Sequence, residues 1–386
     1  MHLLKESVEF PNLFSGDIEI NRVAFKLFGL DIYWYGILIA LGVVLGFLYA
    51  MKRSKKVGLI SDNVFDIAFI GIIVGFIGAR AYFCLFYNLM YPEADNKYNL
   101  ITMFTKIHDG GLAIYGGIIF GVIAALIACK VKKSPFLPLL DIAAPAILIG
   151  QSIGRWGNFI NQECYGAPTA GNLPWGMTGT KIALDPIVIE AMGSNAEKTN
   201  VLVHPCFLYE SLWCIVGFLL IHFVANKIRS FDGEVFLYFV LWYGSGRAWI
   251  EALRTDSLYA GSLKISQVVA ITSAVLALIM IIYFRIFTKK EQKPLYVNTD
   301  LSRERLELFE KKIKLDNEKS DAKKAVRKAK KEGSQKIAPS ILGESAEDSE
   351  TKDNEIQKNN EDETNDENEN NNEDERNNED KGEQEK

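Results

Sequence analysis

The chain has 386 residues, of which 48% are hydrophobic, and a formal net charge of −5. Residues 289–386 hold 21 of the 43 Lys and Arg residues and 28 of the 48 Asp and Glu residues, which leaves 22 basic and 20 acidic residues for 1–288. So few charges over the first 288 residues argue against a soluble globular fold. The overall charge describes neither part and gives no reason to expect a nucleic-acid partner.

Seven apolar segments have the length of membrane spans, since a helix of about 20 apolar residues crosses the roughly 30 Å hydrocarbon core. Three of them are 20 residues long and carry no charge: Ile32–Met51, Gly110–Cys129 and Ile265–Phe284. The other four contain one charged residue each: Ile67–Tyr91, Leu137–Gly154, Cys206–Asn226 and Val235–Ile250. The sequence therefore predicts an all-α, polytopic membrane protein with a seven-helix transmembrane bundle.

Basic residues gather in alternate short loops, after the first, third, fifth and seventh spans. They are Lys52, Arg53, Lys55, Lys56, Lys130, Lys132, Lys133, Lys227, Arg229, Arg285, Lys289, Lys290 and Lys293. Short loops rich in Lys and Arg stay on the cytoplasmic side. We therefore expect the N-terminus outside the membrane and the C-terminus in the cytoplasm.

Composition divides the chain into three parts. Residues 1–288 hold the spans, and their long loop 159–205 is expected to form a small extracytoplasmic cap. Residues 289–342 carry a net charge of +7 and are expected to form a basic juxtamembrane segment in the cytoplasm. Residues 343–386 carry a net charge of −14 with almost no apolar residues, which predicts a disordered tail. The tail is interpreted as a solubilising extension without a role in the chemistry.

Glycines recur at a spacing of four residues on the predicted helices. The pairs are Gly42 and Gly46, Gly71 and Gly75, Gly117 and Gly121, and Gly150 and Gly154. Small residues at this spacing let helix backbones approach closely in lipid. The pattern predicts a compact bundle.

Charged residues within or beside the spans are the main functional indication, because they are costly at membrane depth and tend to face a cavity. They are Arg80, Asp141, Arg155, Glu210, Arg247 and Glu251. Alternatively, these residues could serve only to form ion pairs between helices. For Arg80 and Asp141 this structural interpretation is as good as a role in function.

Arg155 has polar neighbours at helical spacing. Gln151, Asn158 and Gln162 share its face, and these amides beside a guanidinium suit a phosphate better than a carboxylate partner alone. This stripe suggests recognition of a phospholipid headgroup.

Arg247 belongs to a second polar stripe. Tyr243, Glu251 and Arg254 lie on the same helical face, and Glu251 is placed to hold Arg247 in position. Two arginines near one membrane boundary strengthen the headgroup interpretation.

The run Gly154–Glu163, with the sequence GRWGNFINQE, resembles the signature of the bacterial prolipoprotein diacylglyceryl transferases. Further motifs of that family follow in the right order, and the resemblance covers about residues 10–288. They are Tyr33–Gly36, Gly78–Arg80, Phe86–Asn88, Asp109–Leu112, His204–Pro205, Tyr209–Glu210 and Tyr243–Arg247 with Glu251.

The resemblance implies a multi-pass enzyme of the bacterial cell membrane that carries out the first step of lipoprotein maturation. It would transfer the diacylglyceryl group of phosphatidylglycerol to the lipobox cysteine of a prolipoprotein, form a thioether and release glycerol 1-phosphate. Its partners would be these two substrates and the membrane lipids. Neither a cofactor nor a metal is expected.

The same resemblance implies roles for individual residues. Arg155 would bind the phosphate of phosphatidylglycerol, with Asn158 beside it. Arg247 would be the second essential cation, positioned by Glu251, and Tyr35 would line the lipid site.

The resemblance also assigns Arg80 to substrate binding. Tyr115 is a position at which this sequence departs from the family pattern. Some relatives have a His at this position, a natural candidate for the general base. A phenol with a reference pKa near 10 is a poor base at neutral pH. We favour a positioning role for Tyr115, and Glu251 and Glu163 remain alternative bases.

Two other classes of function are open. A transporter or flippase for a phospholipid or an anionic solute would also need arginines within a glycine-rich bundle. It would usually show internal repeats, and the sequence shows none. A structural scaffold would leave the charges within the spans unexplained.

Overall fold

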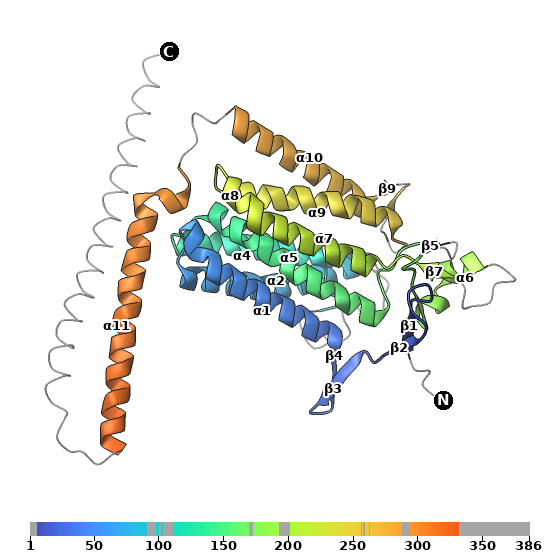
Figure 1. Ribbon diagram of the computed structural model, residues 1–386, viewed down its shortest axis with the longest axis horizontal. Helices are drawn as coiled ribbons and strands as arrows, with labels where there is room; N and C mark the ends of the chain where they lie inside the picture. Colours follow the sequence, from blue (N-terminus) through green and yellow to red (C-terminus); the bar gives the residue numbers. More distant parts are fainter. Residues whose placement is uncertain are drawn as a thin grey trace. The chain divides into compact units, whose positions relative to one another are not determined.

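The computed structural model describes residues 6–90, 98–99, 102, 111–169, 173–192, 201–255, 257, 259–261, 263–287 and 294–331. Most of these residues are helical (Figure 1), which confirms the predicted class of helical, polytopic membrane protein. The acidic tail 343–386 and the motif residues Asp109 and Gly110 lie outside the described residues.

Within the described part of the chain, six helices are long and apolar enough to cross a membrane. They are α1 (Trp34–Ser54), α2 (Ser61–Met90), α4 (Ile114–Val131), α5 (Phe136–Asn161), α7 (Cys206–Leu220) with its continuation to Ile228, and α10 (Ile265–Ile286). The continuation of α7 consists of a π-helical segment, η4 (Ile221–Ala225), and α8 (Asn226–Ile228).

The remaining predicted span, Val235–Ile250, lies in helix α9 (Glu234–Leu253), which has 20 residues. It is less apolar than the other six, because Gly, Ser, Trp and Tyr residues accompany Arg247 and Glu251. The helix packs against α5, α7 and α10. It belongs to the bundle although its composition alone does not mark it as a span.

Helix α5 lies at the centre and packs against α1, α7 and α9. Its contact with α1 depends on small residues: a Cβ added to Gly42 would lie 3.0 Å from the carbonyl oxygen of Gly150. A Cβ added to Gly46 would lie 2.7 Å from the carbonyl oxygen of Ala146. The predicted close packing is therefore confirmed for this pair of helices.

Helices α2 and α4 form a second close pair. A Cβ on Gly75 would lie 3.0 Å from the carbonyl oxygen of Gly117, and Gly71 faces Gly121. Gly154 is the exception to the predicted packing, since a Cβ there would meet nothing within 4 Å.

Short strands, which the all-α prediction did not include, gather at one end of the bundle (Figure 1). Strand β1 (Glu6–Glu9) pairs antiparallel with β2 (Asp17–Ile20) and with β6 (Thr178–Gly179). The other pairs are β3 (Val23–Leu27) with β4 (Leu30–Tyr33), β5 (Pro168–Thr169) with β7 (Leu202–Val203), and β8 (Tyr259–Ala260) with β9 (Leu263–Lys264).

Residues of strands β1 and β7 form a small apolar core with the short helix α6 (Pro186–Met192) and the segments around them. Val8 of β1 is fully buried against residues from the loop between α5 and α7. This core contains Phe10, Tyr165, Met177, Ile182, Val188, Val201, Val203 and Phe207. The N-terminal segment and the long loop thus fold together at the end of α5 that carries Arg155.

The chain divides into two compact units, Met1–Leu308 and Phe309–Lys386. Helix α11 (Asp300–Lys331) begins in the first unit, where buried Ser302 donates its hydroxyl hydrogen to the carbonyl of Gly58, 3.0 Å away. Gly58 has a positive φ of 83°, and a Cβ there would collide with Ser302. Through this contact, the start of α11, which follows the last span in the sequence, packs against the turn between α1 and α2.

Candidate functional site

Arg155 lies near the C-terminal end of α5 and pairs with a carboxylate of another helix. Its Nη2 is 2.5 Å from Oε2 of Glu210, which lies on α7. Only 5% of the Glu210 side chain is exposed, compared with 19% of the Arg155 side chain. The carboxylate is therefore inside the bundle, and the guanidinium is the more exposed member of the pair.

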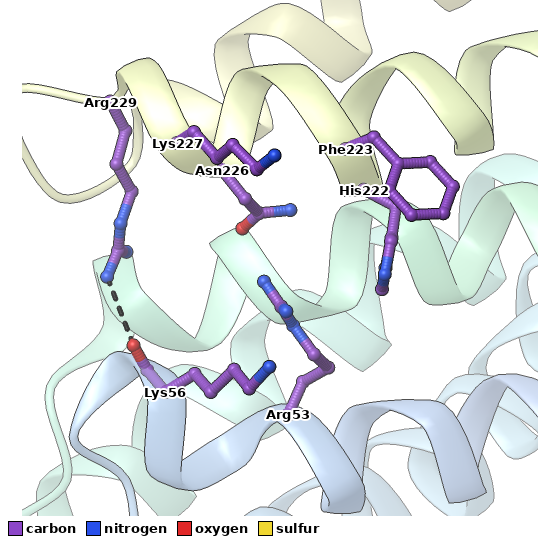
Figure 2. Close-up of a pocket in the computed structure, with 7 residues that line it drawn as sticks. All are labelled: Arg53, Lys56, His222, Phe223, Asn226, Lys227 and Arg229. Carbon is purple, nitrogen blue, oxygen red and sulfur yellow. Dashed lines mark hydrogen bonds between the residues drawn. The ribbon is translucent and has the colours of Figure 1, made fainter.

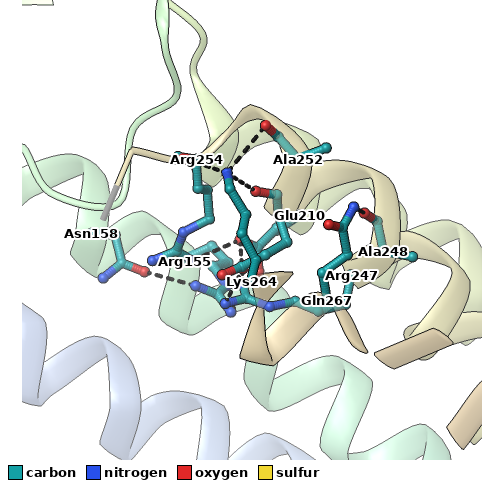
Figure 3. Close-up of polar contacts among 10 residues, drawn as sticks. Arg155, Asn158, Glu210, Arg247, Ala248, Ala252, Arg254, Lys264 and Gln267 are labelled. Carbon is teal, nitrogen blue, oxygen red and sulfur yellow. Dashed lines mark hydrogen bonds and ion pairs between the residues drawn. The ribbon is translucent and has the colours of Figure 1, made fainter. Parts of the chain in front are cut away.

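Two arginines of the α9 region bind the other oxygen of Glu210. Arg247 Nη1 lies 3.1 Å from Oε1, and Arg254 Nη1 lies 3.2 Å from the same atom. Figure 3 shows the side chains converging on Glu210. One buried carboxylate thus holds three guanidinium groups, a set we call the Glu210 cluster (Arg155, Glu210, Arg247 and Arg254).

The end of α9 is fixed by further contacts. Glu251 Oε2 lies 2.6 Å from Arg247 Nη2, one helical turn away. The Nζ of Lys264 donates to the carbonyl oxygens of Glu251, Ala252 and Arg254 at 2.8, 3.2 and 2.7 Å. A cation bound to the last carbonyls of a helix is stabilised by their unsatisfied acceptors and by the helix dipole.

The exposure of these groups divides them into two sets. The side chains of Arg155 and Arg247 are 19% and 18% exposed, whereas Glu251 is only 2% exposed. Three guanidinium groups against the carboxylates of Glu210 and Glu251 leave one positive charge. The partly exposed surface is therefore cationic and presents guanidinium N–H groups, which suit a phosphate.

Asn158 and Tyr35 border Arg155. Asn158 accepts a long hydrogen bond from Arg155 Nη1 at 3.4 Å and donates to Glu163 Oε1 at 2.9 Å. Tyr35, in the first turn of α1, packs on Gly157, where an added Cβ would lie 2.6 Å from the tyrosine ring. The structure thus brings Arg155, Asn158, Arg247 and Glu251 together and places Tyr35 beside them.

The two other predicted site residues lie on the α2–α4 pair. Arg80 is buried in α2, donates to the carbonyl of Gly111 at 3.0 Å and lies over the ring of Tyr98, 5.0 Å from its centre. Tyr115, in the first turn of α4, is half exposed. Among the described residues no hydrogen bond or ion pair joins Tyr115 to the Glu210 cluster.

Asp141, the remaining charge within a span, has a structural role at the other end of α9. Its carboxylate accepts from the backbone N–H groups of Gly233 and Phe236 at 2.9 and 3.0 Å, and lies 3.4 Å from Arg229. Carboxylates at a helix N-terminus satisfy its unpaired N–H groups. For Asp141 the structural alternative is therefore the better one.

The sequence placed Arg254 on the same helical face as Arg247 and named Glu210 among the charges within the spans. It missed the central role of Glu210 and the participation of Lys264. Nothing in the sequence shows that Glu210 serves arginines from two other segments.

His204 precedes α7 and lies close to Tyr209, with its Nδ1 3.2 Å from the tyrosine hydroxyl. Burial lowers the pKa of His204, which favours the neutral imidazole. In the part of the chain that the structure describes, no group of three or more His, Cys, Asp or Glu residues could hold a metal ion.

These observations define a polytopic membrane protein whose helix bundle holds a cationic site at one end. A family model of the prolipoprotein diacylglyceryl transferases matches residues 22–283. The chain therefore belongs to the prolipoprotein diacylglyceryl transferase family.

Individual relatives agree with this membership. The chain is 42% identical over 266 residues to the phosphatidylglycerol–prolipoprotein diacylglyceryl transferase of Finegoldia magna, which covers 69% of this chain and 96% of the relative. It is 40% identical over 278 residues to the enzyme of the same name from Staphylococcus aureus strain MSSA476. This match covers 72% of this chain and 92% of the relative. The match confirms the predicted class of enzyme, a prolipoprotein diacylglyceryl transferase and not a transporter or a scaffold.

Replacing Glu210 by Ala should destabilise the bundle, because three guanidinium groups lose their shared counter-ion. Removing one partner of a buried ion pair costs about 3–5 kcal/mol. The midpoint of thermal unfolding in detergent micelles, followed by tryptophan fluorescence, measures the effect. Asp66→Ala is the matched control, because Asp66 pairs with Lys132 at 2.5 Å where both side chains are about 40% exposed, and such pairs contribute only about 0–1 kcal/mol. Equal shifts in the two variants would contradict the structural role of the Glu210 cluster.

Proposed function

We propose that this protein transfers the diacylglyceryl group of phosphatidylglycerol to the lipobox cysteine of a prolipoprotein. The family and the names of its relatives support this activity. The observation that carries it is the pair of partly exposed guanidinium groups, Arg155 and Arg247, held by Glu210 at one end of the bundle.

The reaction joins a sulfur to a carbon and breaks a carbon–oxygen bond. The thiol of the acceptor loses its proton to a base, and the thiolate attacks the glyceryl carbon that is bonded to the phosphate oxygen. The electron pair of the broken bond stays on this oxygen, so that glycerol 1-phosphate leaves with one more negative charge than the phosphodiester had. The main demand on the protein is stabilisation of this charge.

Arg155 and Arg247 meet this demand in the proposed mechanism. Their side chains come from different helices but share one carboxylate, which sets their separation and orientation before the lipid binds. Cations fixed in advance where charge develops are most effective in a site that excludes bulk water. Glu210 and Glu251 act as positioning residues, and Asn158 holds the Nη1 edge of Arg155.

Access for the lipid is proposed at Gly154 and Tyr35. Gly154 precedes Arg155 on α5, and a Cβ added there would meet nothing within 4 Å. Tyr35 lies against Gly157 on the same side and would line the path of the acyl chains. A substrate that arrives laterally from the membrane can therefore reach the guanidinium without crossing the core of the bundle.

Arg→Lys substitution separates phosphate binding from ion pairing. A lysine keeps the charge but loses the planar fork that binds two oxygens. We expect Arg155→Lys and Arg247→Lys to lower turnover at least about 100-fold, or about 2.7 kcal/mol in transition-state energy. The assay measures thioether-linked lipopeptide formed from phosphatidylglycerol and a lipobox peptide, per membrane-inserted protein.

Arg285→Lys is the matched control, because Arg285 pairs with buried Glu234 at the other end of α9. Its turnover should stay within about threefold of the original, since a lysine still neutralises a carboxylate. Near-normal turnover of both Arg155→Lys and Arg247→Lys would refute the role of these arginines in binding the phosphate.

Tyr115 is proposed to position substrate through its ring and not to transfer a proton. Its side chain is half exposed in the first turn of α4. Tyr115→Phe should therefore keep turnover within about threefold, whereas Tyr115→Ala should raise KM for phosphatidylglycerol. A loss of two orders of magnitude in Tyr115→Phe, with an altered pH profile, would instead identify the hydroxyl as an acid or base.

The orientation is proposed from the basic loops, with the N-terminus outside and the C-terminus in the cytoplasm. It places the Glu210 cluster and the strands on the outer side. Green fluorescent protein fused after Lys386 should fluoresce, while alkaline phosphatase at the same place should be inactive. The reverse pair of results would invert the orientation and the placement of the site.

A further inference from the structure

A second cationic feature lies away from the proposed active site. A cavity of about 360 Å³ opens between the C-terminal end of α1 and the segment η4–α8 (Figure 2). Its lining residues are Arg53, Lys56, His222, Phe223, Asn226, Lys227 and Arg229. We call this cavity the Arg53–Lys227 pocket.

The pocket and the Glu210 cluster lie at opposite ends of the bundle. Helix α1 runs antiparallel to α5, because Tyr35 contacts Gly157 at one end while Gly46 faces Ala146 further along. Arg53 follows Trp34 by 19 residues, or about 28 Å of helix, which is close to the thickness of the hydrocarbon core. When the start of α1 lies at one membrane surface, Arg53 lies at the headgroup level of the other.

The pocket carries a net positive charge that the protein leaves largely uncompensated. Arg229 is held by Asp141 at 3.4 Å, by Asp232 at 3.9 Å and by the carbonyl of Lys56. Across the described residues, no carboxylate lies within 4.0 Å of the side-chain nitrogens of Arg53, Lys56 or Lys227. Three cations around one small cavity repel each other, and an anion between them would relieve this repulsion.

The backbone at the pocket has an unusual conformation that places its polar groups. Residues Ile221–Ala225 form a π-helix, a feature often found at functional sites. Asn226 Nδ2 donates to the carbonyl of Ile221 at 2.7 Å, and His222 Nδ1 lies 2.8 Å from the hydroxyl of Tyr49 on α1. These contacts connect the π-helix to α1 and fix one wall of the pocket.

The border of the pocket is apolar on the side of the π-helix. Phe223 lines the cavity and is mostly exposed, and its neighbours Leu220 and Val224 are exposed large hydrophobic residues. On a helix within a membrane such residues face lipid tails. A phosphate in the pocket would therefore lie beside a surface on which acyl chains can pack, which favours a lipid over a soluble anion.

We propose that the Arg53–Lys227 pocket binds the phosphate of an anionic glycerophospholipid in the leaflet opposite the Glu210 cluster. The bound phosphate bridges α1 and the η4–α8 segment by accepting hydrogen bonds from Arg53, Lys56 and Lys227. Basic residues attract anionic headgroups with about 1 kcal/mol each near the surface. The pocket adds a defined position, since its cations come from two separate segments.

Native mass spectrometry of the full-length protein in nonionic detergent tests the proposal, with dioctanoyl phosphatidic acid as the probe. The double variant Arg53→Gln/Lys227→Gln is compared with Lys52→Gln/Lys130→Gln, which loses the same charge at residues outside the pocket. The Glu210 cluster can hold one lipid phosphate in all three proteins, so the quantity compared is the affinity for the additional phosphatidic acid molecule. The pocket variant should bind this additional lipid at least about tenfold more weakly, and the control should bind it like the original protein. Both variants keep the Glu210 cluster, so that a difference between them reports on the pocket alone.

Two further arms separate the sources of phosphate. Dioctanoyl phosphatidylcholine, which has no net charge, should not compete for the site that the pocket variant weakens, and inorganic phosphate at the same concentration should not displace the lipid from it. If the double variant does not fold, exposed Lys227→Gln alone, with Lys130→Gln as its control, should still weaken binding about threefold. Equal affinities of pocket and control variants, or displacement by inorganic phosphate, would overturn the proposal.

Discussion

The bundle depends on one carboxylate that is shared by three guanidinium groups. Glu210 connects α7 to Arg155 of α5 and to Arg247 and Arg254 of the α9 region, within 3.2 Å in each case. Buried charges are costly unless they are paired and hydrogen-bonded, so these side chains can remain inside only while their helices keep their mutual positions. The geometry of the site and the packing of the central helices are therefore one constraint.

Helix α9 shows how this constraint extends through the molecule. Asp141 of α5 binds its first N–H groups, and Lys264 binds its last carbonyl groups. Both ends of a helix that carries Arg247 and Glu251 are thus held by charges from neighbouring segments. In lipid, where the apolar surface of a helix gives no preference for another helix, such polar contacts and close small-residue packing determine the arrangement.

The helical bundle and most residues of the candidate site could be predicted from the sequence, because charges and glycines in long apolar segments have few physical interpretations. The spacing from Gln151 to Gln162, and from Tyr243 to Arg254, placed the right residues on common helical faces. The ion pairs between residues of different helices could not be predicted, since helical spacing does not tell which helix faces meet. For this reason the role of Glu210 was not predicted. Strands of two to five residues such as β1 and β5 were not predicted either, because they are too short to show a periodic pattern. The π-helix at His222 has no local sequence signal.

The contact between Gly58 and Ser302 has a consequence for biosynthesis. The two residues are 244 positions apart, and a ribosome adding about 5–20 residues per second needs roughly 12–50 s to synthesise the intervening chain. During this interval the turn after α1 lacks its final partner, while the helices between them enter the membrane. The first hairpin of the bundle is therefore completed by one of the last segments to be made, which ties the earliest membrane insertion to the end of translation.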